Sequence, residues 1–158
     1  MPAKPPERPN DVKLVTRNKK ARFEYHIIDT VEAGMVLMGS EVKSIRDGQV
    51  NIADAFARVD DGEVWVHNME ISKYPFANIL NHEPKRPRKL LLKKSEIRKL
   101  HSQLMEKGLT IIPLALLFRR GLAKLELGVG RGKKLFDKRE DLKKREAKRD
   151  IERASSRK

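Results

Sequence analysis

The side chains that most often carry out catalysis are few and far apart in this sequence. Cysteine is absent, which excludes disulfides, thiolate metal sites and cysteine nucleophiles. Asp60 and Asp61 are adjacent carboxylates, but their place before Gly62 indicates a turn, which explains them without catalysis. None of the four histidines has a second histidine or a carboxylate at metal-ligand spacing such as HExxH: His26, His67, His82 and His101. We expect no enzyme activity, no bound metal and no cofactor.

A glycine-rich segment ahead of two lysines is the one stretch that looks suited to phosphate. Gly128, Gly130 and Gly132 precede Lys133 and Lys134, yet the spacing fits neither GxGxxG nor GxxxxGK[ST], so nucleotide binding is disfavoured. Flexible glycines before lysines would let the backbone approach an RNA strand, or they mark the junction between a folded body and a tail.

Positive charge is gathered into three blocks. Lys and Arg outnumber Asp and Glu by 36 to 22, for a net charge of +14. Residues 1–22 hold seven cations and two acids, residues 85–99 hold eight and one, and residues 131–158 hold thirteen and six. These blocks carry +19 together, so the rest of the chain is mildly acidic, at −5. Basic patches of this kind attract polyanions, either nucleic acid or an anionic membrane surface.

RNA fits this composition better than a membrane does. No segment joins a basic face to a strongly apolar one, so a membrane surface ranks last among the partners. No apolar run approaches the roughly 20 residues that cross a bilayer, and the first residues lack the apolar region of a signal peptide, so we expect a soluble, cytoplasmic protein. Aromatic residues are only 5% of the chain, which favours recognition of RNA shape and backbone over stacking on many bases.

The segments that must position these charges divide into an arm, a body and a tail. Residues 1–17 contain four prolines and few apolar side chains, which predicts a flexible N-terminal arm. Residues 18–130 carry the strand and helix patterns. Residues 131–158 have too few apolar side chains for a full stripe, so this basic tail is expected to be disordered when free and to become helical when RNA phosphates neutralise its cations.

Two hairpins dominate the predicted body. Residues 52–59 and 64–71 flank the turn Asp60–Gly62, whose glycine tolerates a positive φ. Residues 110–118 and 122–129 flank a second turn at Arg119–Gly121, with alternating side chains facing inward.

Further elements surround the hairpins. Alternation from Phe23 to Val31 predicts a strand. Short helices are expected from Ser40 to Arg46 and from Ser95, acting as an N-cap, to Gly108. The proline-containing stretch 74–88 is predicted to be a long loop. Five or six strands joined mostly to their neighbours predict a mainly β, closed or nearly closed antiparallel barrel with two or three short helices, and an open α+β sheet is the alternative.

Five strings, in order and at compatible spacing between Asn18 and Arg153, resemble the tmRNA-binding SmpB (SsrA-binding protein) family. They are Asn18–Tyr25 (NKKARFEY), Glu32–Arg46 (EAG at its start and GSEVKSIR at its end), Arg88–Leu92 (RKLLL), Gly108–Pro113 (GLTIIP) and Gly132–Arg139 (GKKLFDKR). Each string is weak alone, whereas five together make a strong match. The loop Tyr74–Asn78 departs from the family pattern, and the resemblance assigns it no role.

The resemblance implies a fold and a function. It implies an OB-like barrel that binds the tRNA-like domain of tmRNA and, with it, rescues stalled ribosomes by trans-translation without catalysis. The partners implied are tmRNA, elongation factor Tu in complex with alanyl-tmRNA, and the small-subunit RNA of the ribosome at the decoding region. The C-terminal tail would occupy the empty mRNA channel and be helical there. No membrane, DNA or cofactor is implied.

Residue roles follow from the positions that match the family strings. The candidates to face tmRNA are Asn18, Lys20, Arg22, Glu32, Arg46, Arg88, Lys89, Leu91 and Lys124. The candidates to face the ribosome are Lys133, Lys134, Asp137, Lys138 and Arg139. The cations would contact phosphates, while Glu32 and Asn18 would accept from bases or ribose hydroxyls. For Glu32 an internal arginine partner is an equal alternative, and for Leu91 packing in the barrel explains the residue as well.

Two other functions remain open at this point. A ribosomal or assembly protein would bind ribosomal RNA with the same barrel and tail. A small nuclease would use His and Lys, and sustained RNA cleavage abolished by one histidine substitution would identify it.

Overall fold

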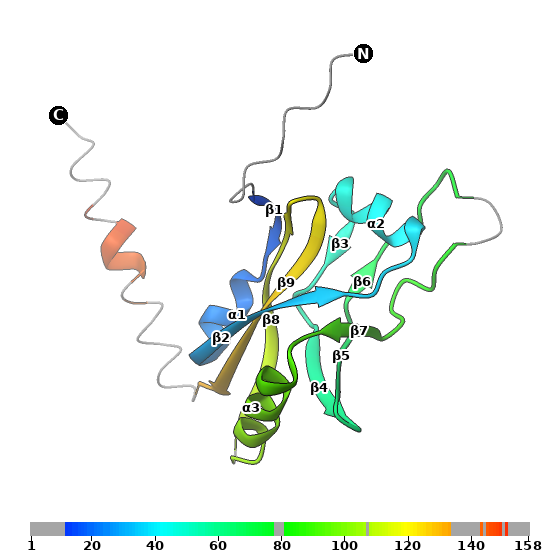
Figure 1. The fold of residues 1–158 in the computed structure, drawn as a ribbon. Coiled ribbons are helices and arrows are strands. Elements are labelled where there is room, and N and C mark those ends of the chain that lie inside the picture. The colour runs from blue at the N-terminus through cyan, green and yellow to red at the C-terminus, as the bar shows by residue number, and fades with distance from the viewer. Residues whose placement is uncertain are drawn as a thin grey trace.

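The protein folds around a β-barrel, shown in Figure 1 as a computed structural model that describes residues 12–77, 81–106, 108–133, 143, 145–149 and 151. In chain order the elements of the body are β1 (Val12–Arg17), α1 (Lys19–Glu24), β2 (Tyr25–Met35), α2 (Gly39–Arg46), β3 (Val50–Asn51), β4 (Phe56–Asp60), β5 (Glu63–His67), β6 (Glu70–Ile71), β7 (Arg88–Leu91), α3 (Lys94–Leu104), β8 (Leu109–Arg119) and β9 (Leu122–Gly132).

Six strands close into a ring. Their order is β8, β4, β5, β7, β2 and β9, and β9 pairs again with β8, with every pairing antiparallel. The closure between β4 and β8 is narrow, with Ala57 opposite Ile111 as its only register pair among the described residues. Closing the sheet into a ring pairs the strand edges that an open sheet would expose. The mainly β, closed antiparallel barrel predicted from the sequence is confirmed.

The N-terminal segment differs from the expected flexible arm. Residues 12–17 form β1, which pairs with β8 outside the ring, and residues 1–11 lie outside the described part of the chain. All four prolines of the predicted arm precede residue 10, so they do not restrict the backbone or remove hydrogen-bond donors within Val12–Arg17. On this side β8 pairs with β4 only at Ile111 within the described part of the chain, so its residues 115–119 are left to supply backbone partners for this segment, a contribution that local composition does not reveal.

The start of β2 is also later than predicted. Residues 19–24 form α1, and the strand begins at Tyr25 rather than at Phe23. Asn18 starts this helix, because its Oδ1 accepts a hydrogen bond from the backbone N–H of Ala21 at 3.1 Å.

Both predicted hairpins form, but the first is shorter than expected: its strands are Phe56–Asp60 and Glu63–His67, and Glu70–Ile71 pairs with β3 instead. In the first turn Asp61 and Gly62 have φ of 48° and 75°, and in the second Arg120 and Gly121 have φ of 52° and 76°. Paired positive φ values twist a two-residue connection in the same sense as the strands that it joins. The second hairpin, β8 and β9, has eleven residues in each strand.

The two predicted helices form, but different residues cap them. The caps of α2 and α3 are Met38 and Lys93, each two residues before the predicted cap. At each start a glutamate in the first turn accepts from the backbone N–H of the cap residue: Glu41 Oε1 from Met38 at 2.8 Å, and Glu96 Oε1 from Lys93 at 2.9 Å. No helix formed by the described residues is long and apolar enough to cross a membrane.

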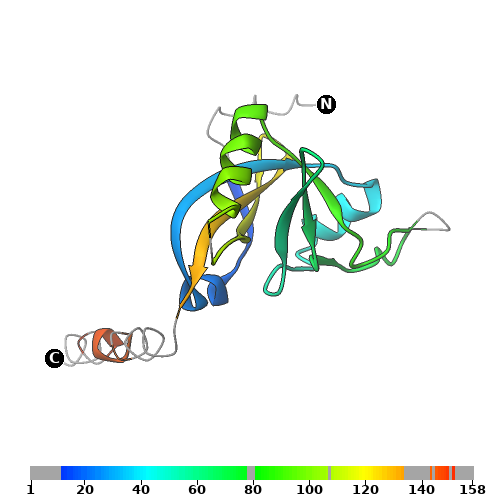
Figure 2. The same ribbon diagram turned by 90° about the horizontal axis from the view of Figure 1, so that it is seen from below.

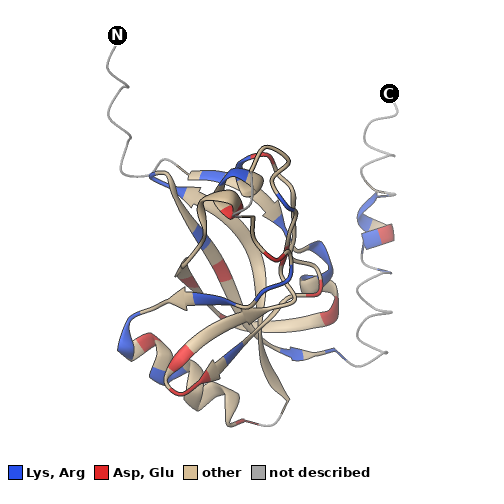
Figure 3. Cartoon of the chain, turned by 90° about the vertical axis from the view of Figure 1, so that its right-hand side faces the viewer, with Lys and Arg blue, Asp and Glu red and all other residues tan. Residues whose placement is uncertain are grey.

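The interior of the ring is filled by aliphatic side chains from most of its strands. Fully buried members include Val64 and Val66 of β5, Ile111 and Leu116 of β8, and Leu127 of β9. Side chains along β5 alternate between this interior and the outer surface, whereas nearly every residue of β8 is buried. Figure 3 shows Lys and Arg on several elements of the barrel, with Asp and Glu between them.

Candidate nucleic-acid interface

Three of the residues predicted to face tmRNA come together on the outer face of β7, β2 and β9. Gly34 of β2 lies opposite Leu91 on one side and opposite Lys124 on the other. Because Gly34 has no side chain, the neighbours fill its place: a Cβ there would lie 3.3 Å from Leu91 Cβ and 3.6 Å from Lys124 Nζ. Leu91 is 52% exposed and outside the core, so packing inside the barrel does not explain it.

Glu32 completes this group, and it has an internal partner. Arg119 donates from Nε at 3.2 Å to both oxygens of Glu32, and from Nη2 at 3.0 Å to Oε1. Glu32 also lies directly opposite Glu126, so the guanidinium offsets a repulsion between like charges. We call Glu32, Leu91, Arg119 and Lys124 the β2–β9 patch; it combines an exposed aliphatic side chain, the ammonium of Lys124 beside Gly34 and the ion pair of Arg119 with Glu32.

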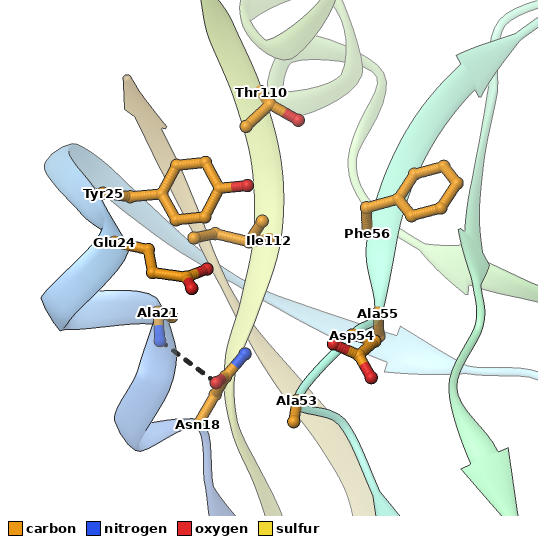
Figure 4. A pocket seen from close by; sticks show the side chains of 10 residues that line it. All are labelled: Asn18, Ala21, Glu24, Tyr25, Ala53, Asp54, Ala55, Phe56, Thr110 and Ile112. Carbon is orange, nitrogen blue, oxygen red and sulfur yellow. Dashed lines mark hydrogen bonds between the residues drawn. The ribbon is translucent and has the colours of Figure 1, made fainter. Parts of the chain in front are cut away.

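A second group of predicted residues lies on α1, and one of them is buried. Asn18 is only 6% exposed, and its Nδ2 donates to the carbonyls of Pro113 at 3.0 Å and Ile52 at 3.2 Å. Both ends of its amide are therefore used inside the protein (Figure 4). Asn18 fixes α1 to a bulge of β8, and it does not offer an acceptor to RNA.

The cations of α1 differ in how far they are engaged. Lys20 Nζ lies 3.5 Å from Asp54 Oδ1 and 3.8 Å from Glu24 Oε1. Both carboxylates line a cavity of 280 Å³ between α1 and the start of β4 (Figure 4). Such exposed ion pairs contribute little and can be exchanged for phosphate contacts. Arg22 is exposed on the other side of the helix.

Arg22 borders a larger groove on the outside of β1 and β8. The groove has a volume of 760 Å³, an apolar floor that includes Leu14 and Leu117, and a basic rim formed by Arg17, Lys19, Arg22, Arg145 and Arg149. Two of these arginines belong to the described helical part of the C-terminal tail, which lies beside α1 in Figures 1 and 2. The Arg145 guanidinium lies 5.5 Å from the ring centre of Phe23, a cation–π contact between tail and body.

The family of the chain is decided by comparison with known proteins. The family described as "SmpB protein" matches residues 15–157, which include both the barrel and the tail. The chain belongs to the SmpB family.

Curated relatives agree with this assignment. The SsrA-binding protein of Desulforudis audaxviator (strain MP104C) is 56% identical over 143 residues, which cover 90% of this chain and 94% of that protein. The SsrA-binding protein of Carboxydothermus hydrogenoformans is 54% identical over 142 residues, covering 90% and 95%. A solved structure described as "tmRNA-SmpB: a journey to the center of the bacterial ribosome" contains a chain with 46% identity and a TM-score of 0.65, covering 76% of this chain and 85% of that one.

One residue suggested by the SmpB resemblance cannot contact RNA. Arg88 is fully buried, and its guanidinium pairs with Glu41 (Nε to Oε2, 2.6 Å) and donates to the carbonyls of Met69, Glu83 and Pro84. Side chains alternate along β7, so Arg88 points inward and Lys89 outward. Burial lowers the pKa of Arg88 and the Glu41 carboxylate opposes that shift, but an arginine remains charged at any physiological pH.

The partner of Arg88 explains why the charge is buried. Glu41 also accepts from Arg86 and from the backbone N–H of Met38. Burial raises the pKa of Glu41, but the hydrogen bonds from Arg86, Met38 and Arg88 outweigh it, so the pKa lies below its ordinary value. The cluster ties α2 to the loop between β6 and β7, which makes Arg88 a residue that holds the fold.

The remaining predicted contacts of the barrel are accessible but dispersed. Lys89 is half-buried on the outer face of β7 and pairs with Glu63 of β5 at 3.1 Å. Arg46 is exposed at the end of α2, on the side of the barrel away from α1 (Figures 1 and 2). The structure therefore gathers Glu32, Leu91 and Lys124, sets Lys20 and Arg22 apart on α1, and leaves Arg46 separate.

Most of the predicted ribosome-facing residues lie outside the described part of the chain. Only Lys133 is described, and its backbone N–H donates to the carbonyl of Glu24 at 2.7 Å, which continues the strand pairing past Gly132. The other four are Lys134, Asp137, Lys138 and Arg139. The described tail residues 143, 145–149 and 151 are helical.

Four arginines at these surfaces were not predicted from the sequence: Arg17, Arg119, Arg145 and Arg149. Arg119 was predicted to lie in a turn, but it is the last residue of β8, two residues beyond Leu117, which lies opposite Lys124. Because β8 is buried along nearly all of its length, no alternation of apolar and polar residues marks the outward face of Arg119. Arg17 was assigned to the arm because of the prolines before it. The tail arginines at the groove, Arg145 and Arg149, are four positions apart, which is the helical spacing that puts two side chains on one face.

Proposed function

We propose that this chain binds the tRNA-like domain of tmRNA and, with it, rescues stalled ribosomes by trans-translation. The observation that carries the proposal is the family match, which spans residues 15–157 and so includes both barrel and tail. The solved chain that it resembles is described with tmRNA and the bacterial ribosome, so both RNAs are the partners to test first.

The RNA-facing surface that we propose is revised by the geometry. Its centre is the β2–β9 patch, and its other members are Lys20, Arg22, Arg46 and Lys89. We exclude Asn18 and Arg88 from the RNA contacts, because their side chains bind groups inside the protein. Asn18 holds α1 in place, and Arg88 holds β7 in place. The cations act by neutralising phosphates, and Glu32 acts by orienting Arg119.

We also propose a division of labour along the chain. The barrel holds tmRNA, while the tail, with Lys133, Lys134, Asp137, Lys138 and Arg139, binds small-subunit RNA at the decoding region and enters the empty mRNA channel as a helix. Elongation factor Tu, bound to alanyl-tmRNA, would deliver the complex. The protein acts by binding rather than by catalysis, and in the cytoplasm, where the ribosomes are.

The direct test is to purify the tagged protein from bacterial cells and to sequence the RNA bound to it. The proposal expects tmRNA to be enriched over ribosomal RNA, relative to the composition of the lysate. Enrichment of ribosomal RNA without tmRNA would instead identify a ribosomal or assembly protein.

A further inference from the structure

The long loop between β6 and β7, residues 72–87, displays two aromatic rings that no part of the proposed function uses. Its described residues, 72–77 and 81–87, lie on the side of the barrel away from α1 (Figures 1 and 2). The rings of Tyr74 and Phe76 lie edge to face, with centres 5.5 Å apart and an angle of 68° between their planes. Phe76 is 82% exposed, although a ring of this size is normally placed where it can exclude water.

The backbone that carries these rings is held in one conformation. Asn81 bonds Tyr74 twice, accepting from its N–H at 3.3 Å and donating to its carbonyl at 2.9 Å. The N–H of Ala77 donates to the same carbonyl at 3.1 Å, which closes a turn with Phe76 inside it. The exposed ring is therefore presented by a defined turn.

The start of the loop is attached to α2. Ser44 Oγ donates to the carbonyl of Ser72 at 2.7 Å, and the N–H of Ser72 donates to the carbonyl of Gln49 at 3.0 Å. The second half of the loop is fixed by His82, whose ring bridges Ser40 Oγ at 2.9 Å and the carbonyl of Ile71 at 2.8 Å. A ring mounted on a pre-organised turn loses little conformational entropy when a ligand stacks on it.

A cation accompanies the rings. Lys43 Nζ, on the exposed face of α2, lies 5.5 Å from the centre of the Tyr74 ring. Within the described part of the chain Lys43 makes no ion pair, so its charge is available to a partner. An exposed ring beside an ammonium matches a nucleotide, which offers a flat base to the ring and a phosphate to the cation.

We propose that Phe76, supported edge-on by Tyr74, stacks on an unpaired nucleobase of RNA while Lys43 contacts a phosphate of the same strand. Two rings supply far less area than the roughly 800 Å² that each partner buries in a standard protein interface, whereas one ring face is enough for one base. The inference rests on the proposed RNA-binding function. The base belongs either to tmRNA or to ribosomal RNA, and the stacking chemistry is the same for both.

The test compares the full-length protein with F76A, F76L and F76W in two assays. The first measures affinity for purified tmRNA, and the second measures binding of the preformed protein–tmRNA complex to ribosomes stalled without a codon in the A site. M105A is the matched control, because Met105 is also a large exposed side chain, 77% exposed at the end of α3. Thermal unfolding checks that each variant folds, which is expected because Phe76 is mostly in solvent.

In the assay that reports the contacted RNA, F76A and F76L are expected to weaken binding by about fivefold or more, while F76W and M105A stay near wild type. Loss in the first assay assigns the base to tmRNA, and loss in the second alone assigns it to ribosomal RNA. Wild-type binding by F76L together with weak binding by F76A would overturn the proposal, because an aliphatic contact with protein would then suffice. Unchanged binding of all variants in both assays would overturn it as well.

A second variant tests the charge. K43Q is expected to reduce the slope of log affinity against log salt by about 0.7 to 0.9 in the same assay that responds to Phe76. An unchanged slope contradicts the phosphate contact. Failure of the wild-type protein to bind either RNA would defeat the proposed function itself, whereas normal wild-type binding with unaffected variants defeats only the role of the loop.

Discussion

Arg88 and Lys89 are adjacent cations with opposite environments. Strand geometry turns Arg88 into the protein, where Glu41 and three carbonyls surround it, and turns Lys89 to the outer face. A charge that is buried and fully hydrogen-bonded holds the fold, while a charge in solvent can be exchanged for a phosphate. From the sequence alone both residues are predicted to contact RNA. Which side chains of a four-residue strand face inward depends on its pairing with neighbouring strands, which the local sequence does not show.

Removing Arg88 is therefore expected to cost stability rather than a specific RNA contact. In R88A the carboxylate of Glu41 loses its buried partner, although Arg86 remains, and we expect the free energy of unfolding to fall by about 3 kcal/mol. K89A is the matched control, because its exposed pair with Glu63 contributes at most about 1 kcal/mol. Urea unfolding measures both; equal, small losses for the two variants would show that the Glu41 cluster does not stabilise the fold.

Lys124 is the cation of the β2–β9 patch that has the clearest path to a phosphate. K124Q is expected to weaken tmRNA binding and to reduce the salt slope by about 0.7 to 0.9, since one phosphate contact is lost. K94Q, an exposed lysine on α3, is the control and should leave the slope unchanged. Titrating tmRNA at several salt concentrations measures both slopes, and identical slopes for the two variants would remove Lys124 from the interface.

At the scale of elements, the position of α1 depends on one side chain. Asn18 caps the helix and bonds two carbonyls of the barrel. N18A should lower the free energy of unfolding by about 1 to 3 kcal/mol and speed amide hydrogen exchange at Ala21, because the helix loses its cap and the carbonyls of Ile52 and Pro113 each lose one donor. N51A is the control, since Asn51 accepts one exposed hydrogen bond, from Ala53, and its loss should cost less. Unchanged exchange at Ala21 in N18A would contradict this role.

The attachment of α2 to the β6–β7 loop is expected to weaken in acid. The pKa of Glu41 is lower in the folded protein than the ordinary value of 4.5, so its contribution to stability is present above that value and is lost as the pH falls through the folded pKa. Urea unfolding of wild type and E41Q between neutral and acid pH measures this contribution. The wild type should lose its advantage over E41Q below the ordinary glutamate pKa. Lys99 also lowers the pKa of Asp29, but that pair is present in both proteins and cancels. A constant difference across the pH range would show that Glu41 does not stabilise the fold as an ion.

Local patterns predicted some elements better than others. Turns and hairpins were found because Asp60–Gly62 and Arg119–Gly121 specify positive φ within a few residues. β1 and α1 were not, because one needs the edge of β8 and the other needs carbonyls at Ile52 and Pro113, both far away in sequence. The strand β7 begins at Arg88, the last residue of the predicted loop 74–88, and its other residues were assigned to no element. Its pairing with β2 and β5 likewise comes from distant residues.

At the scale of the whole molecule, closure of the ring creates the candidate interface. Leu91, Gly34 and Lys124 are far apart along the chain and become neighbours because β7, β2 and β9 are adjacent in the barrel. Their association with RNA was suggested by family resemblance, whereas their proximity follows only from the fold. The three basic blocks of the sequence predicted binding of a polyanion. They did not predict that the side chains of Arg88 and Asn18 would be buried and hydrogen-bonded within the protein.

The central claim is that the barrel binds tmRNA and the tail acts on the ribosome. Truncation after Lys133 separates the two, because β9 ends at Gly132 and the backbone of Lys133 completes its pairing. The truncated protein should bind tmRNA with nearly the affinity of the full chain and yet fail to support peptide tagging on stalled ribosomes. Parallel loss of tmRNA binding and tagging, in a variant whose thermal unfolding matches that of the full chain, would contradict the account.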